Sequence, residues 1–188
     1  MKKFLMGKTV LSVLLAGSIM NASATEQEGT ISFRGFIYNA TCSIDLNDTN
    51  SPDADVLMGR YPTSAFNSSG DEVGGEDGYG SLDISLRDCP DKGIVTLQLH
   101  GQQKGGYNAI LELDNPDSSE TAKNIGIVLY DRDDMDKDII INGSVTEEYE
   151  VSSSAEWHAN YVAKYISTAD DVEAGQADAT LDYTLSYN

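Results

Sequence analysis

Apolar and polar residues alternate along most of the 188-residue chain, and this period of two constrains its fold more than any other feature. Successive side chains of a β-strand point to opposite faces, so each alternating run predicts a strand with one buried face. Short strands with no convincing helical stretch between them predict an all-β sandwich. The runs lie at residues 31–37, 82–86, 95–99, 110–113, 125–130, 139–141, 161–165 and 179–187.

Turn-forming residues at positions 47–52, 89–93, 105–106 and 142–143 separate these runs, which supports the division into short strands. One segment departs from the alternation, because residues 67–80 contain five glycines among acidic residues and serines. We predict an exposed loop there, since such a segment is too polar and too rich in glycine to form a strand.

The first 24 residues have the composition of a secretory signal peptide. Three lysines give a positively charged start, an apolar stretch follows, and a small-residue cleavage pattern ends the segment. The apolar stretch is too short to span a bilayer, and no other run is long and apolar enough, so we expect an exported domain without membrane insertion. The residues concerned are Lys2, Lys3, Lys8, the stretch 10–20 and Ala22-Ser23-Ala24.

The chain is strongly acidic, with 31 Asp and Glu against 12 Lys and Arg and a net charge of −19. Such a chain repels nucleic acid and anionic lipid headgroups, so neither is an expected partner. High charge is also typical of disordered chains. The recurring aliphatic and tyrosine-rich runs instead favour a packed core beneath an acidic surface.

Cys42 and Cys89 are the only cysteines, and both follow the predicted signal peptide. In an oxidising compartment such a pair predicts a disulfide, with two buried free thiols as the alternative. On the loop-entropy model, a bond closing this loop disfavours the unfolded chain by about 4 kcal/mol. His100 and His158 are isolated from the cysteines in sequence, so we expect no metal site.

The acidic stretch at residues 131–138 invites comparison with the EF-hand pattern of calcium-binding loops. Neither register of the EF-hand pattern places glycine at its sixth position and glutamate at its twelfth, so we predict an acidic hairpin turn between Tyr130 and Ile139. The chain has no Gly-x-Ser-x-Gly elbow and no phosphate-binding loop, and we expect neither catalytic residues nor a cofactor. Trp157 with nearby tyrosines could form a sugar-binding platform, but burial in the sandwich is the favoured interpretation.

The two ends of the expected mature chain both alternate like strands. The N-terminal run precedes the first cysteine, and the C-terminal run stops one residue before the end of the chain. One face of the N-terminal run carries Gly29, Ile31, Phe33, Gly35 and Ile37, and the other carries Thr30, Ser32, Arg34 and Phe36. The apolar residues at alternate positions of the C-terminal run are Ala179, Leu181, Tyr183, Leu185 and Tyr187.

These features together resemble the pilins of chaperone–usher fimbriae, especially type 1-like subunits, over nearly the whole expected mature chain. The most specific are the penultimate Tyr187 and Gly175, which is fourteenth from the C-terminus. The other matching elements are Gly29-Thr-Ile-Ser-Phe-Arg-Gly35, Asn39-Ala-Thr-Cys42, Val56-Leu-Met-Gly59, Leu86-Arg-Asp-Cys89-Pro90 and Tyr161-x-Ala-x-Tyr165.

The resemblance implies an incomplete immunoglobulin-like β-sandwich that lacks its last strand and is completed by a donor strand. It implies that a periplasmic chaperone first fills the resulting groove, and that the N-terminal extension of a neighbouring pilin subunit then replaces it, a known form of strand addition. An outer-membrane usher and a homopolymer on the cell surface are the further expectations, with a role in adhesion. The implied division is signal peptide 1–24, donor extension 25–38 and pilin domain 39–188.

By the same resemblance, Ile31, Phe33, Gly35 and Ile37 would enter successive pockets of a neighbour. Gly175, Ala179, Leu181, Tyr183, Leu185 and Tyr187 would form the groove edge that binds the chaperone and then the neighbour. Two other classes of protein remain as alternatives at this point. They are a monomeric secreted β-sandwich that binds carbohydrate and a small secreted hydrolase.

Overall fold

The computed structural model describes residue 32 and residues 42–90, 92–152 and 156–187. The chain divides into two units, residues 1–37 and 38–188, and the fold described below belongs to the second. The predicted signal peptide and the predicted donor residues Ile31, Phe33, Gly35 and Ile37 lie outside the described residues. No helix in the described ranges combines the length and apolar character that a bilayer crossing needs.

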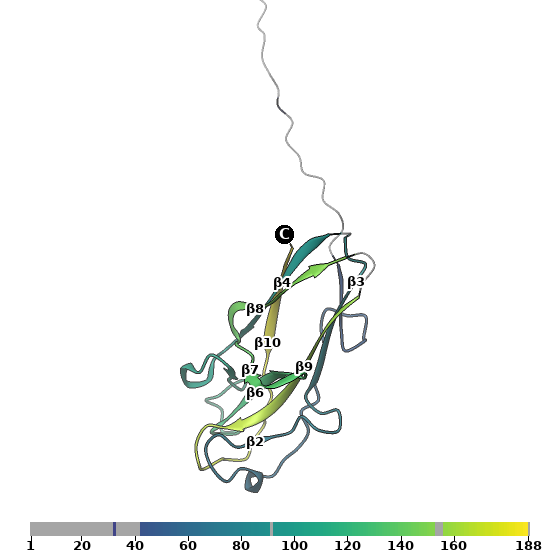
Figure 1. Ribbon diagram of the computed structural model, residues 1–188. Coiled ribbons are helices and arrows are strands. Elements are labelled where there is room, and N and C mark those ends of the chain that lie inside the picture. Colours follow the sequence, from purple (N-terminus) through teal and green to yellow (C-terminus); the bar gives the residue numbers. More distant parts are fainter. Residues whose placement is uncertain (1–31, 33–41, 91, 153–155, 188) are drawn as a thin grey trace, which may run out of the picture. The chain divides into compact units, whose positions relative to one another are not determined.

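The described residues form two β-sheets, and all pairings between the named strands are antiparallel (Figure 1). The larger sheet has the order β1-β3-β9-β6-β5, with β2 also paired to β9 and β7 to β6. Its strands are β1 (Ser43–Leu46), β2 (Glu72–Val73), β3 (Ser81–Arg87), β5 (Ile110–Leu111), β6 (Ile125–Asp131), β7 (Asp134–Asp138) and β9 (Trp157–Ser167). The all-β prediction is therefore confirmed.

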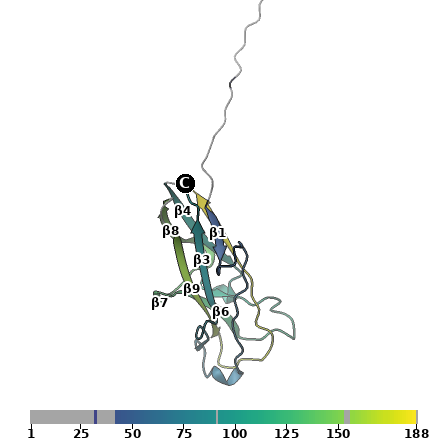
Figure 2. The ribbon, with the colours of Figure 1, turned by 90° about the vertical axis from the view of Figure 1, so that its right-hand side faces the viewer.

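The smaller sheet has three strands in the order β10-β4-β8, which places the C-terminal strand at one edge. Its strands are β4 (Gly93–Gly101), β8 (Asn142–Val151) and β10 (Leu181–Tyr187). Two single-turn 3-10 helices, η1 (Thr63–Ala65) and η2 (Lys104–Gly106), lie in the connections. The larger sheet, with β1 beside β3, is seen from another side in Figure 2.

The main core joins the inward faces of the two sheets. Leu97 and Leu99 of β4 are buried in one cluster with Ile84 of β3, Ile127 of β6 and Tyr161 of β9. These residues are apolar positions of the predicted strand runs, so the sequence pattern predicted that they face inward. Burying each large aliphatic side chain stabilises the fold by about 1.5–3 kcal/mol before the cost of ordering it.

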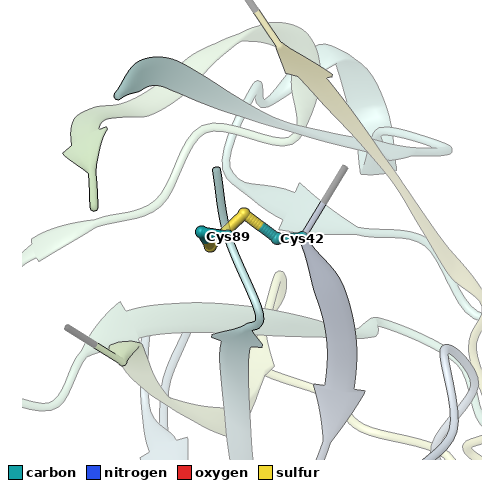
Figure 3. The surroundings of a disulfide bond; sticks show 2 residues. All are labelled: Cys42 and Cys89. Atoms are coloured by element: carbon teal, nitrogen blue, oxygen red, sulfur yellow. A yellow bond between two sulfur atoms is a disulfide. The ribbon is translucent and has the colours of Figure 1, made fainter. Parts of the chain in front are cut away.

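A second, smaller core surrounds the disulfide between Cys42 and Cys89, which is formed as predicted (Figure 3). Cys42 directly precedes β1 and Cys89 lies just after β3, so the bond ties together the ends of two paired strands. Buried Leu86, Val95 and Val151 pack around it. The small core therefore links the larger sheet to β4 and β8 of the smaller one.

Within the glycine-rich segment, the prediction that no strand forms is wrong. Most of residues 67–80 are exposed as expected, but Glu72–Val73 pairs with β9 as β2. Polar contacts hold this short strand, because the Glu72 carboxylate accepts hydrogen bonds from the Tyr130 hydroxyl and from Lys164 Nζ, the latter at 3.2 Å. Residue composition did not reveal β2, since its stability comes from strands distant in sequence.

The boundary between residues 139–141 and Asn142-Gly143 also differs from the prediction. Ile139 and Ile141 are buried in a connection, and β8 begins at Asn142, where a turn was expected. Gly143 has φ +82°, and the pairing of β8 with β4 shifts register beside it. Glycine tolerates this backbone conformation, so the strand accommodates it as a bulge. The predicted acidic hairpin after Tyr130 is present, but its turn is confined to Arg132 and Asp133, because residues 134–138 form strand β7.

Candidate functional site

The C-terminal strand β10 pairs with β4 along its whole length, from Leu181↔Gly101 to Tyr187↔Val95, without a register shift. Among the described strands, only β4 pairs with it, so its other edge borders no strand. The apolar residues of β10 are half-buried and the residues between them are exposed. An unpaired strand edge with one apolar face is suited to accept a further strand.

Residues 52–61 lie across from β10 and form the second bank of a groove. The segment belongs to no strand, yet its side chains alternate like one. Asp53, Asp55 and Leu57 are exposed, and Ala54, Val56 and Met58 between them are half-buried. Ala54 and Met58 pack against the main core. The family resemblance had singled out only residues 56–59, and the alternation over the longer segment was the available signal that the sequence analysis missed.

The groove between these banks has a volume of about 1330 Å³ and an apolar floor. The floor consists of buried side chains contributed by strands of both sheets, so the groove opens directly onto the main core. These side chains are Leu46, Ile84, Leu99, Leu111, Ile127, Leu129, Ala163 and Tyr165. A single extended segment with apolar residues at every second position would cover such a floor.

Two tyrosines fix the position of the groove walls. The Tyr183 hydroxyl on β10 donates to the Pro52 carbonyl at 2.8 Å, which joins the two banks. The Tyr165 hydroxyl on the floor donates to the Ala177 carbonyl at 3.0 Å. Burial raises the pKa of Tyr183, with the nearby Asp53 carboxylate acting in the same direction, so this hydroxyl stays protonated and can donate at neutral pH.

The residues predicted for the groove edge fall into three positions. Ala179, Leu181 and Tyr183 line the groove. Leu185 and Tyr187 continue along β10 and pack against the disulfide core. Gly175 lies outside the groove lining, where a Cβ atom would come within 2.3 Å of the Ala122 backbone nitrogen. The close approach of two backbone segments therefore explains why glycine is needed at this position.

The outward-facing rim of the groove is acidic. Asp53 and Asp55 are exposed on one bank, and Asp178 and Asp182 are exposed on the other. Arg60 is the only Lys, Arg or His among the described residues that line the groove. The groove thus combines an apolar floor with a negatively charged rim.

Trp157 has a structural environment in this fold. Its ring stacks on Tyr149 of β8, with the ring centroids 3.7 Å apart and the planes 7° from parallel. Both rings are half-buried against the disulfide core. One face of the indole is therefore already covered, and the stack does not offer an open aromatic platform for a sugar.

The fold and the groove define a class of protein, namely incomplete immunoglobulin-like β-sandwiches. Among solved structures, the P pilus rod subunit PapA superposes with a TM-score of 0.58 at 20% identity, covering 79% of this chain and 100% of that chain. A chaperone–usher pilus structure gives 0.60 at 20% identity, covering 88% and 99%.

The sequence comparisons identify the family. The family model described as fimbrial protein matches residues 31–188. A type-1 fimbrial protein subunit of Serratia marcescens is 30% identical over 191 residues, covering 100% of this chain and 99% of the relative. Long polar fimbria protein A of Salmonella typhimurium is 26% identical over 187 residues, covering 98% and 99%. The chain belongs to the fimbrial protein family. It is a structural subunit of a fimbria, exported to the cell surface, and not an enzyme.

Proposed function

We propose that the subunits polymerise by donor-strand exchange, in which residues 25–38 of one copy fill the groove of the next. Ile31, Phe33 and Ile37 enter the groove, and Gly35 passes where a side chain would collide. The observation that carries this proposal is the apolar groove beside the unpaired edge of β10. The alternation of the N-terminal run matches what an occupant of that groove requires.

The energetics favour an occupied groove. Each large apolar residue of the donor run contributes about 1.5–3 kcal/mol on burial, before the cost of ordering the segment. Backbone hydrogen bonds to the free edge of β10 add to this. An empty groove exposes apolar floor and strand edge together, which promotes aggregation.

A temporary occupant is therefore needed between export and assembly. A periplasmic chaperone that lends a strand to the groove meets this need, and an outer-membrane usher then directs the exchange. The residues for capture are Ala179, Leu181 and Tyr183 in the groove and Leu185 and Tyr187 beyond it, with Gly175 fixing the approach to β10. The resulting homopolymer supports adhesion at the cell surface.

Replacing Phe33 with Asp in the full chain, expressed in its native bacterium, tests the donor role. We expect more than a tenfold loss of SDS-resistant, heat-labile multimers, because a charged side chain cannot enter the apolar groove without a large desolvation cost. The chaperone complex of this variant should persist, since its own groove is intact. Phe33→Leu is the matched control and should assemble normally, and normal fibres from Phe33→Asp would refute the proposal.

Deleting residues 185–188 tests the capture role of β10. The deletion shortens the free edge of β10 and removes Leu185 and Tyr187, which pack on the disulfide core. We therefore expect capture by the chaperone to be lost. Co-purification with the chaperone is the measurement. Capture at the level of the intact chain would show that the end of β10 has no part in binding.

A further inference from the structure

Two large apolar side chains on the groove rim are exposed without a reason in the fold. The exposed fraction is 74% for Leu57, the highest among the large hydrophobic side chains of the described residues, and 44% for Tyr79. Their segments are joined, because the Gly80 backbone N–H donates to the Leu57 carbonyl at 2.8 Å. An exposed apolar pair beside a binding groove indicates contact with the occupant.

The same bank is acidic two and four residues earlier, at Asp55 and Asp53. On the opposite bank, Asp182 is exposed at the start of β10. A segment lying in the groove has its outward face between these carboxylates. A positive charge on that face would be attracted, and a negative charge would be repelled.

The occupant that fits this rim is the N-terminal run of a second copy. This inference rests on the proposed function. The run carries Arg34 and Phe36 on the face opposite the predicted groove-filling residues. Arg34 is the only Lys or Arg in residues 25–41, and Phe36 is a large apolar residue on a face that groove filling leaves unexplained.

We propose that Arg34 of the incoming copy lies between Asp55 and Asp182, and that Phe36 covers Leu57 and Tyr79. This outward contact fixes the register of the exchanged strand and selects the chain's own extension over others. The spacing agrees, because Arg34 and Phe36 are two residues apart, as are Asp55 and Leu57.

The spacing also fixes the direction of the incoming strand. At one end of the bank, the Pro52 carbonyl accepts a hydrogen bond from the Tyr183 hydroxyl of β10. At the other end, the centroid of the Tyr61 ring lies 6.1 Å from that of Tyr165, whose hydroxyl donates a hydrogen bond to the Ala177 carbonyl. The bank therefore runs opposite to β10. A strand that places Phe36 beside Leu57 and Arg34 beside Asp55 runs in the same direction as residues 52–61. It is therefore antiparallel to β10. The reverse direction would place Phe36 near Asp53.

In this register the inward faces are also complementary. Phe33 lies beside Ala54, and Gly35 lies beside Val56, so a large residue meets a small one in both places. Alternation of large and small residues across facing positions allows close packing. The outward contact and the groove contact therefore select the same register.

Charge reversal in the full chain tests the polar half of the contact. Arg34→Glu and Asp55→Arg should each lower the amount of SDS-resistant, heat-labile surface multimers by about three- to tenfold, as expected for exposed charge pairs turned repulsive. The combined variant Arg34→Glu/Asp55→Arg should recover to within about twofold of the unchanged chain. Asp136→Arg, on the exposed strand β7, is the control and should have no effect.

The apolar half is tested by Phe36→Ser and Leu57→Ser. Each should reduce multimers, and the double variant should be no worse than either single one, because both remove the same contact. Additive losses would overturn the pairing.

Phe33→Asp separates this inference from the proposed function. If it abolishes multimers while the four rim variants assemble normally, or if the combined charge reversal fails to recover, the rim contact is wrong and strand exchange stands. If Phe33→Asp also assembles normally, both fail.

Discussion

The two edge strands of the three-stranded sheet, β10 and β8, differ in how readily a further strand can pair with them. Strand β10 pairs with β4 in seven consecutive register pairs and carries no charge after Asp182. Strand β8, at the opposite edge, shifts register with β4 at two places. It also carries three carboxylates, from Glu147, Glu148 and Glu150.

Both features of β8 discourage added strands, because bulges twist an edge away from ideal pairing and charges on it resist burial. The regular edge of β10 has neither feature and lies beside an apolar groove instead. The sheet can therefore be extended on one side only. With the proposed donor segment, a subunit that has one acceptor edge would assemble head to tail into a filament.

We expect the largest effect on stability from a change in the disulfide core, because both edge strands pack against it. The disulfide core packs against Leu185 and Tyr187 of β10 and against Tyr149 and Val151 of β8. Replacing Cys42 with Ser should lower the free energy of unfolding by about 2–5 kcal/mol, as for other small exported domains. Urea unfolding of the purified full chain, with a Ser43→Ala control, measures it. An unchanged midpoint would mean that the bond does not hold the edges.

Removing the charges from β8 should make its edge behave more like that of β10. Glu148 and Glu150 are exposed and pair across from Thr96 and Ile94 of β4. The double replacement Glu148→Thr/Glu150→Thr should increase aggregation several-fold, since threonine favours strands and the repulsion is gone. Light scattering measures the aggregates, which should be SDS-sensitive, unlike exchanged multimers. The control Asp134→Thr/Asp136→Thr alters β7 instead.

The smallest effect concerns Glu147, which turns partly inward from β8. Burial raises the pKa of this carboxyl, with Asp131 acting in the same direction and the Tyr161 hydroxyl offsetting part of the shift. The folded state therefore binds the proton more tightly than the unfolded state, and stability falls as the pH rises above the ordinary value of 4.5 towards the folded pKa. At neutral pH the whole penalty is present.

Glu147→Gln should thus stabilise the fold at pH 7 and lose this advantage at pH 4. Thermal unfolding of the variant and the unchanged chain at both pH values measures the difference. Glu148→Gln is the matched control on an exposed neighbour. A gain of equal size at both pH values would contradict the proposed burial effect.

Much of the fold followed from local pattern. The alternating runs identified inward residues of β3, β4, β9 and β10, because a strand shows its environment at every second position. Strand β6 is buried at five consecutive positions, so alternation does not apply to it. Three features did not follow. The polar strand β2 depends on Tyr130 and Lys164, the buried Ile139 and Ile141 lie in a connection, and the bank at 52–61 faces a groove without being a strand.

The predicted groove edge shows the same division at the level of single residues. Leu181 and Tyr183 were identified from alternation, and they line the groove. Leu57 and Tyr79, which are 22 residues apart, were not identified as a pair. The backbone hydrogen bond from Gly80 to Leu57 brings their two segments together at the groove, and no local pattern encodes that bond.

The sequence by itself determined that the chain is all-β and which faces of its strands are apolar, and it favoured a disulfide between its two cysteines. These properties depend on the side-chain period and on two cysteines in an exported chain. Only the tertiary structure decided that β10 is left at an edge, and that residues 52–61 stand apart from it across an open floor. Strand order is set by pairing between residues distant in sequence, so the position of a missing strand appears only once the other strands are in place.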